Sequence, residues 1–206
     1  IDNILLAMPL VGDQHLQKLL FILKKNKNSN VLFIVDSIEG LHGLNQIGKI
    51  LRKKINVLVA INGGADREGL QPKSVLPFIK ILINKDWVEF KGLFTYFGHI
   101  YDEDKSQFQN LTKEEAQLLV DIKEIIETLG ISVDILSAGS TLSSQYPKYL
   151  NGITESRAGN CIFYDWNAVQ LGITTIENCA LTVLTTVIHI HRNGKATIDA
   201  GSKALS

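Results

Sequence analysis

Short apolar runs alternate with longer segments of helical periodicity along most of the chain. The apolar runs predict strands at 4–8, 31–36, 56–61, 90–97, 133–137 and 153–157. Between them, apolar residues recur every three or four positions, which predicts helices over 13–25, 37–54, 72–84 and 112–129. Because strands that alternate with helices form parallel sheets, this order predicts an α/β fold.

Two of the predicted helices have capping residues at their ends. Ser37 immediately precedes an apolar helical pattern and suits an N-cap. Thr112 and Glu115 have the spacing of a capping box, in which each side chain accepts a backbone N–H at the start of a helix. Gly130 suits the C-terminal end of the same helix. These residues predict helices that begin after Ser37 and near Thr112.

The pattern changes near residue 178. The segment 180–192 is too long and too rich in β-branched residues for a barrel strand, and Asn193-Gly194 predicts a two-residue hairpin turn before a partner strand at 195–200. We therefore predict a partial (β/α)8 TIM-type barrel over 1–177 and the start of an antiparallel β domain over 178–206. Since a complete barrel needs about 250 residues, we expect a barrel that lacks its first one or two strands and a chain cut at both ends.

Composition excludes several classes of partner. The 206 residues include 21 Lys and Arg against 21 Asp and Glu, so the zero net charge gives no electrostatic case for nucleic acid or an anionic membrane. No apolar run reaches the roughly 18 residues of a membrane span. Cys161 and Cys179 lie outside any C-x-x-C motif, and we expect them to be reduced, buried thiols in a cytoplasmic protein.

Candidate chemistry lies at the carboxyl ends of the predicted strands, where (β/α)8 barrels place their active sites. In chain order these residues are Arg67 after the third strand, Tyr96, His99, Tyr101 and Asp102 after the fourth, Gly139, Ser140 and Thr141 after the fifth, and Arg157, Gly159 and Asn160 after the sixth. Glycine-containing turns at adjacent late strands are typical of a phosphate site built from backbone N–H groups. Each turn alone is ordinary loop chemistry.

Three segments of the chain resemble a known family, the fold-type III pyridoxal-phosphate enzymes that include D-threonine aldolases and D-serine dehydratases. The segments are 92–99 (GLFTYFGH), 155–165 (ESRAGNCIFYD) and 199–206 (DAGSKALS). The resemblance implies an alanine-racemase-like barrel followed by a D-serine-dehydratase-like β domain. It also implies pyridoxal phosphate as cofactor, lyase activity on a small D-3-hydroxy amino acid, and a homodimer.

The same resemblance implies roles for the candidate residues. Arg157 would face the pyridine nitrogen and hold it unprotonated, because arginine does not give up its proton. Tyr96 would lie beside the ring, and Arg67 would reach the cofactor phenolate or the substrate carboxylate. The remaining roles are phosphate binding by Gly139, Ser140, Thr141, Gly159 and Asn160, and catalytic positions beside the substrate at His99, Tyr101 and Asp102. The alternatives are a surface pair of Arg157 with Glu155, a solvated Arg67, a half-buried barrel aromatic at Tyr96 and an ordinary polar loop residue at His99.

The resemblance places two parts of the family's machinery outside the chain. The lysine that carries the cofactor would lie upstream of residue 1, and the ligands of a divalent metal, zinc or manganese, would lie beyond Ser206. We therefore assign no metal ligand, interpret His189 and His191 as paired surface histidines, and expect no activity from this chain alone.

The aldolases tend to carry a second histidine where this chain has Asp102, so the sequence favours dehydratase chemistry. A D-threonine aldolase, an amino-acid racemase, a non-catalytic pyridoxal-phosphate carrier and a phosphosugar-binding barrel remain as alternatives.

Overall fold

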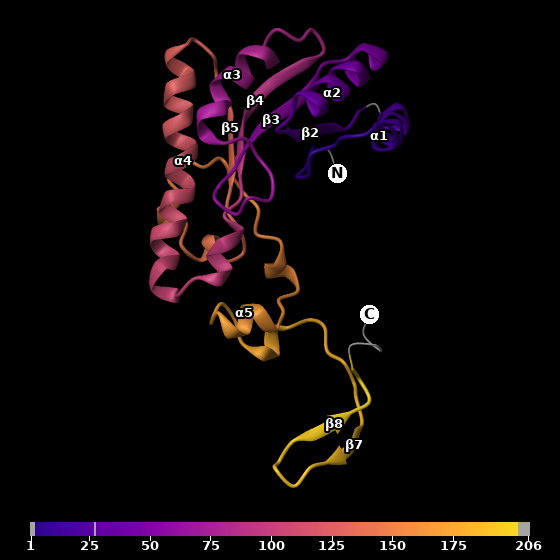
Figure 1. Ribbon diagram of the computed structural model, residues 1–206, viewed down its shortest axis with the longest axis vertical. Helices are drawn as coiled ribbons and strands as arrows, with labels where there is room; N and C mark the ends of the chain where they lie inside the picture. The colour runs from indigo at the N-terminus through magenta and orange to yellow at the C-terminus, as the bar shows by residue number, and fades with distance from the viewer. Residues whose placement is uncertain (1–2, 27, 202–206) are drawn as a thin grey trace. The chain divides into compact units, whose positions relative to one another are not determined.

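A computed structural model describes residues 3–26 and 28–201 (Figure 1). The chain forms two compact units that divide between Gly159 and Asn160, and each is described by itself. The domain boundary predicted after residue 177 stays a prediction. The last of the three resembling segments runs into residues 202–206, which lie outside the described residues.

Six parallel strands form the first unit and curl into a half-barrel (Figure 1). In spatial and sequence order they are β1 (Asn3–Leu6), β2 (Asn30–Val35), β3 (Ile55–Ile61), β4 (Val88–Thr95), β5 (Ile135–Ala138) and β6 (Glu155–Ser156). Each strand pairs with the one that precedes it in the sequence. The partial barrel predicted from the alternating pattern is thereby confirmed.

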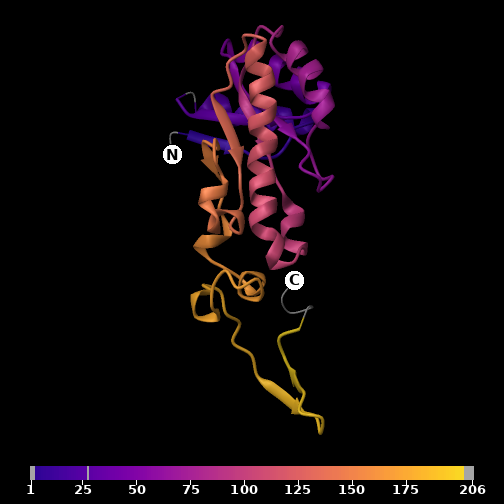
Figure 2. The ribbon, with the colours of Figure 1, turned by 90° about the vertical axis from the view of Figure 1, so that its left-hand side faces the viewer.

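Four helices follow the first, second, third and fourth strands. They are α1 (Asp13–Lys25), α2 (Ile38–Leu51), α3 (Pro72–Leu82) and α4 (Phe108–Thr128). The predicted N-cap is confirmed, since the Ser37 side chain accepts the Gly40 N–H at 3.2 Å. α3 packs on β3 and β4, and α4 packs on β4 and β5. The two views agree that α4 runs alongside β5 (Figures 1 and 2).

The inner strands β2, β3, β4 and β5 bury residues on both faces, which explains why their sequences are mostly apolar runs. An outer layer of side chains, with Phe33, Val35, Val57 and Val59 among them, packs in one cluster with the helices. An inner layer faces the inside of the half-barrel and contains Leu32, Ile34, Leu58, Ala60 and Phe94. The site described below lies above this inner layer, at the carboxyl ends of the strands.

A bulge interrupts β4 where it pairs with β3. Phe90 is opposite Val57 and Gly92 is opposite Leu58, so Lys91 is an extra residue in β4. Gly92 has a φ of +155°, and a Cβ at this position would collide with the Ile135 carbonyl of β5. Only glycine allows the bulged strand to approach β5 this closely.

The capping box predicted at Thr112 is wrong. α4 begins four residues earlier, at Phe108, and the Thr112 hydroxyl donates to the Phe108 carbonyl at 2.7 Å inside the helix. Glu115 is buried and accepts N–H groups from outside the helix, from Phe97 and Gly139. Thr112 is therefore engaged within its own helix and Glu115 by tertiary contacts, and neither has the capping role that their spacing suggested.

The second unit contains a short helix and a hairpin. α5 (Trp166–Gln170) begins after Asp165, whose side chain accepts the Ala168 N–H at 3.0 Å. β7 (Val187–Ile190) pairs antiparallel with β8 (Ala196–Ile198). The long strand predicted over 180–192 is wrong, because only Val187–Ile190 pairs with β8, and the preceding Thr185 and Thr186 bind the Asp199 carboxylate instead.

The hairpin turn also differs from its prediction. The His191 carbonyl accepts the Gly194 N–H at 3.0 Å, and the His191 N–H reaches the Lys195 carbonyl at 2.7 Å. Gly194 has a φ of +80°, whereas Asn193 is not left-handed, so the loop is a three-residue turn rather than a two-residue type I′ turn.

Two further sequence expectations can be compared with the described residues. Cys161 and Cys179 form no disulfide with each other, as expected, but both are partly exposed rather than buried. Within residues 3–26 and 28–201, we find no helix whose length and apolar character would let it span a bilayer.

Candidate functional site

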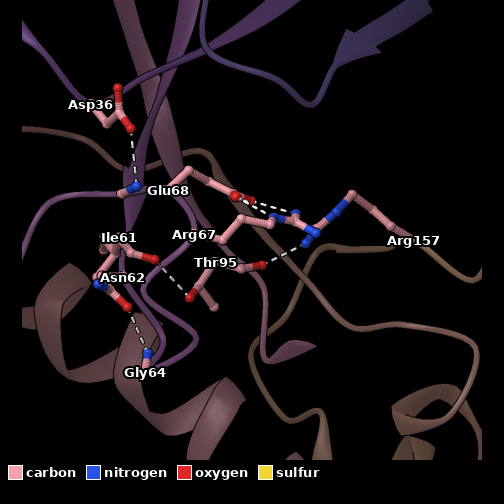
Figure 3. A network of polar contacts seen from close by, with 9 residues as sticks. Asp36, Ile61, Asn62, Gly64, Arg67, Glu68, Thr95 and Arg157 are labelled. Carbon is pink, nitrogen blue, oxygen red and sulfur yellow. Dashed lines mark hydrogen bonds and ion pairs between the residues drawn. The ribbon is translucent and has the colours of Figure 1, made fainter. Parts of the chain in front are cut away.

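Arg157 follows β6 and connects three strand ends. Its Nη1 donates to the Ser137 hydroxyl of β5 at 2.8 Å. Its Nη2 donates to the Thr95 carbonyl of β4 at 2.5 Å (Figure 3). The guanidinium lies 4.0 Å from the centroid of the Phe94 ring, on the inner apolar layer. Among the described residues it forms no ion pair with Glu155, so the surface-pair alternative does not describe this arginine.

Burial changes the acidity of Arg157 without removing its charge at neutral pH. Loss of hydration lowers the pKa of Arg157 to about 10, and the negative charges of Glu115 and Glu155 oppose that shift. A guanidinium has five N–H donors, of which only a part is used by Thr95 and Ser137. The remaining donors can bind an acceptor atom of a ligand at this end of the barrel.

The turn after β5 is preformed by the chain itself. Gly139 has a φ of +88°, and its N–H donates to Glu115 Oε1 at 3.1 Å. The Ser140 N–H donates to the Ser143 hydroxyl at 2.7 Å. Two of the backbone groups predicted for phosphate binding therefore already have acceptors. Within the described part of the chain the Thr141 N–H makes no hydrogen bond, and it remains available. The Ser140 hydroxyl is already engaged, since it accepts the Ser143 N–H at 3.3 Å and lies 3.1 Å from the Ser143 hydroxyl.

Arg67 and Tyr96 are brought together from the loops after β3 and β4. The Arg67 guanidinium lies 4.6 Å from the centroid of the Tyr96 ring. It also pairs with the Glu68 carboxylate (Figure 3). The Arg67 side chain is 60% exposed, so its charge is accessible from solvent. Burial raises the pKa of Tyr96, the neighbouring Tyr101 raises it further, and Arg67 opposes both. The Tyr96 phenol therefore stays protonated at neutral pH.

Two side chains that sequence reasoning did not single out shape the loop that carries Arg67. Asp36 at the end of β2 accepts the Gly69 N–H at 3.0 Å, and Asn62 accepts the Gly64 N–H at 2.7 Å (Figure 3). Their position at a strand's carboxyl end and at the start of a glycine-rich loop was a signal that could have identified them. They fix the loop at both of its ends.

The segment after β4 contains the predicted catalytic residues in a short helical turn, Gly98–Asp102. The His99 ring lies 5.0 Å from the Phe97 ring, and its buried Nδ1 has no hydrogen-bond partner among the described residues. The Tyr101 hydroxyl accepts the Leu142 N–H at 3.4 Å and so joins this turn to the one after β5. Asp102 is exposed to solvent.

Gly159 and Asn160 fall on either side of the division between the two units. Gly159 is exposed at the end of the first unit, and Asn160 begins the second, where its carbonyl accepts the Tyr164 N–H at 2.7 Å. Their phosphate-binding role stays a prediction.

Both arginines line open clefts. Arg157 lines one of about 770 Å³ together with Leu5, Leu32 and Ile135 of the inner layer. Arg67 lines another of about 550 Å³ together with Met8 and Asp36. The clefts give a small molecule access to both cationic groups.

No group of three or more His, Cys, Asp and Glu side chains suited to a metal ion occurs within residues 3–26 and 28–201. The His189 and His191 rings are exposed and meet edge to face, 4.5 Å apart. His191 Nε2 lies 2.8 Å from the Thr197 hydroxyl on the partner strand. This arrangement agrees with the interpretation as paired surface histidines.

Comparison with known families defines the class of protein to which this fold and site belong. Residues 19–165 match the N-terminal domain of alanine racemase. The match covers well over half of the chain, and the chain therefore belongs to this family.

More particular relatives are named enzymes. A D-serine dehydratase of Dictyostelium discoideum is 32% identical over 192 residues, which are 86% of this chain and 48% of that protein. A D-threo-3-hydroxyaspartate dehydratase of Delftia sp. is 28% identical over 186 residues, 88% of this chain and 49% of the relative. A D-threonine aldolase of Arthrobacter sp. is 25% identical over 179 residues, 81% of this chain and 46% of the relative.

The solved structure of the D-threo-3-hydroxyaspartate dehydratase from Delftia sp. HT23 has the same fold. It superposes with a TM-score of 0.82 at 27% identity, over 98% of this chain and 54% of that one. The chain thus spans about half the length of the curated relatives it matches.

Proposed function

We propose that the protein is a pyridoxal-phosphate-dependent lyase that dehydrates a small D-3-hydroxy amino acid. The observation that carries this proposal is the Arg157 guanidinium, held by Thr95 and Ser137 beside the preformed turn at Ser140. The proposal is supported by the family of the barrel and by relatives that are named dehydratases and an aldolase.

The residues present suit this cofactor. Arg157 would offer N–H donors to the ring nitrogen, and the turn after β5 would offer the Thr141 N–H to the phosphate. A Cβ at Gly139 would lie 2.7 Å from the Ser156 hydroxyl, so the turn is as close to β6 as a glycine permits. Tyr96 presents an aromatic ring beside these groups.

Pyridoxal phosphate, when bound, supplies a ring that withdraws electrons from the substrate's Cα. Arg157 would donate a hydrogen bond to the ring nitrogen and keep its proton, because its pKa of about 10 lies well above neutral pH. The protonated Tyr96 phenol can donate to an acceptor. The exposed Arg67 can exchange its bond to Glu68 for the substrate carboxylate, since carboxylates bind arginine in the same two-pronged manner.

Dehydration is favoured over aldol cleavage for a structural reason. Cleavage requires a base for the proton of the substrate's Cβ hydroxyl, and exposed Asp102 is a weak base compared with imidazole. The two relatives with the higher identities are dehydratases. Metal activation and a homodimer remain part of the proposal, but no step is assigned to a metal because the described residues contain no three-ligand cluster.

The test is product analysis with protein expressed from its complete reading frame. With pyridoxal phosphate and D-serine we expect pyruvate and ammonia, and with L-serine neither. Glycine and acetaldehyde from D-threonine, without keto acid, would favour the aldolase, and interconversion of D- and L-amino acids would favour a racemase. Cofactor binding without any turnover would indicate the carrier.

A further inference from the structure

β4 and β5 separate at the site, and two side chains of opposite charge bridge the gap. The last paired residues of the two strands are Phe94 and Ser137. At this level Arg157 binds Thr95 and Ser137. Farther along both strands, where no ladder hydrogen bonds remain, a second side chain bridges the backbones that continue from β4 and β5.

That side chain is Glu115 of α4. Its Oε1 accepts the Phe97 N–H at 3.2 Å from the β4 side and the Gly139 N–H at 3.1 Å from the β5 side. One carboxylate oxygen thus replaces the strand-to-strand hydrogen bonds that end at Phe94 and Ser137. The backbone before His99 and the backbone before Ser140 are held at a fixed separation by a single atom.

Burying the Glu115 carboxylate costs free energy that other interactions must compensate. Its exposed fraction is 1%, and it shares the apolar face of α4 with Leu119 and Ile122. Burying a carboxylate is unfavourable unless hydrogen bonds or an opposite charge compensate. The two N–H groups supply part of that compensation, and the Arg157 charge on the same strand ends favours the ionised form. The second oxygen, Oε2, has no hydrogen-bond partner among the described residues.

We propose that Glu115 is a positioning residue, which sets the separation between the loop of His99 and Tyr101 and the turn of Ser140 and Thr141, and thereby the cofactor's phosphate site. This inference rests on the proposed function. It assigns to Glu115 no contact with cofactor or substrate. Its effect is transmitted by the Phe97 and Gly139 N–H groups.

The test compares three substitutions in protein from the complete reading frame. Glu115→Gln keeps a carbonyl oxygen that can accept both N–H groups, whereas Glu115→Ala leaves them without an acceptor. Glu124→Ala is the matched control, because Glu124 is exposed on the same helix. The readouts are hydrogen exchange in peptides that contain Phe97 or Gly139, and the dissociation constant of pyridoxal phosphate measured by absorbance.

We expect faster exchange at both places in Glu115→Ala, and a dissociation constant raised at least about tenfold, which corresponds to about 1.4 kcal/mol. Glu115→Gln should restore slow exchange and most of the affinity, and Glu124→Ala should match the wild type. Faster exchange with unchanged cofactor affinity would contradict the positioning role, as would failure of Glu115→Gln to restore affinity while exchange is slow.

Failure of the proposed function gives a different result. If the wild-type protein does not bind pyridoxal phosphate at all, the proposed function is wrong, and Glu115 then has no cofactor site to position. If Glu115→Ala does not fold, Glu115→Asp replaces it, because the shorter side chain keeps the charge but cannot reach both N–H groups. Wild-type affinity in a folded Glu115→Asp protein whose two peptides exchange faster would then overturn the proposal.

Discussion

At the scale of single residues, the acidity of Glu115 makes the site sensitive to pH. Burial raises the pKa of Glu115, while hydrogen bonds from Gly139 and Phe97 and the charge of Arg157 oppose the shift. In the unfolded chain the same carboxyl has its ordinary pKa. Between the two values the folded protein binds more protons than the unfolded one, so the free energy of unfolding falls as pH rises through that window.

Glu115→Gln should remove this dependence. We expect the wild type to lose stability relative to the variant as pH rises above the ordinary glutamate range, by at most about 1.4 kcal/mol per pH unit. Urea unfolding at a series of pH values between mildly acidic and neutral measures the difference. Parallel stability curves for the two proteins would show that Glu115 titrates alike in both states.

The sequence located most of the candidate site residues, because a barrel collects the residues that follow its strands. Arg67, Tyr96 and Arg157 were predicted on that ground, and the structure places them beside their strand ends. Glu115 was misread, because a Thr-x-x-Glu pattern is a local signal whereas its partners are distant in the sequence. Its spacing from Leu119 and Ile122 on the apolar face of α4 was the usable signal for burial.

At the scale of elements, close packing of α2 depends on helical glycines. A Cβ at Gly48 would collide with the Trp87 carbonyl and lie 3.0 Å from the Lys53 carbonyl. The Trp87 backbone cannot move freely, since its N–H donates to Asn45 of the same helix at 3.0 Å. Helical periodicity predicted the buried face of α2 correctly. A glycine in the sequence, however, does not indicate which residue packs against it.

Gly48→Ala should therefore destabilise the protein although alanine favours helices. Overpacking costs about 1–3 kcal/mol, which exceeds the gain of roughly 0.5–1 kcal/mol from helix propensity. Lys49→Ala is the control, because Lys49 is exposed on the same helix. Urea denaturation should give a lower midpoint for Gly48→Ala and an unchanged one for Lys49→Ala. An increase for Gly48→Ala would mean that α2 can shift away from Trp87.

At the scale of the whole first unit, the sheet has two open edges. Among the described residues, the outer sides of β1 and β6 pair with no strand. The cleft between these edges exposes parts of the inner layer, including Leu5 and Ile135. Unpaired edges beside apolar surface are sites of association.

The 206-residue chain, purified alone, should therefore dimerise or aggregate through an edge. Ile4→Lys, which puts a charge on β1, should shift it toward monomer in size-exclusion chromatography with light scattering. Ile81→Lys on α3 is a matched control, because the two isoleucines are 42% and 43% exposed. A monodisperse wild-type monomer that melts cooperatively would show that the half-barrel needs no covering of its edges.

The bulge in β4 has a consequence for the two arginines of the site. Before it, Phe90 points to the helices, and in an unbroken strand residues 90, 94 and 96 would share one face. The extra residue, Lys91, shifts the alternation of side chains by one position, so the residues that follow it point to the opposite faces of the sheet. Phe94 and Tyr96 consequently face inward, where Arg157 rests on one ring and Arg67 on the other.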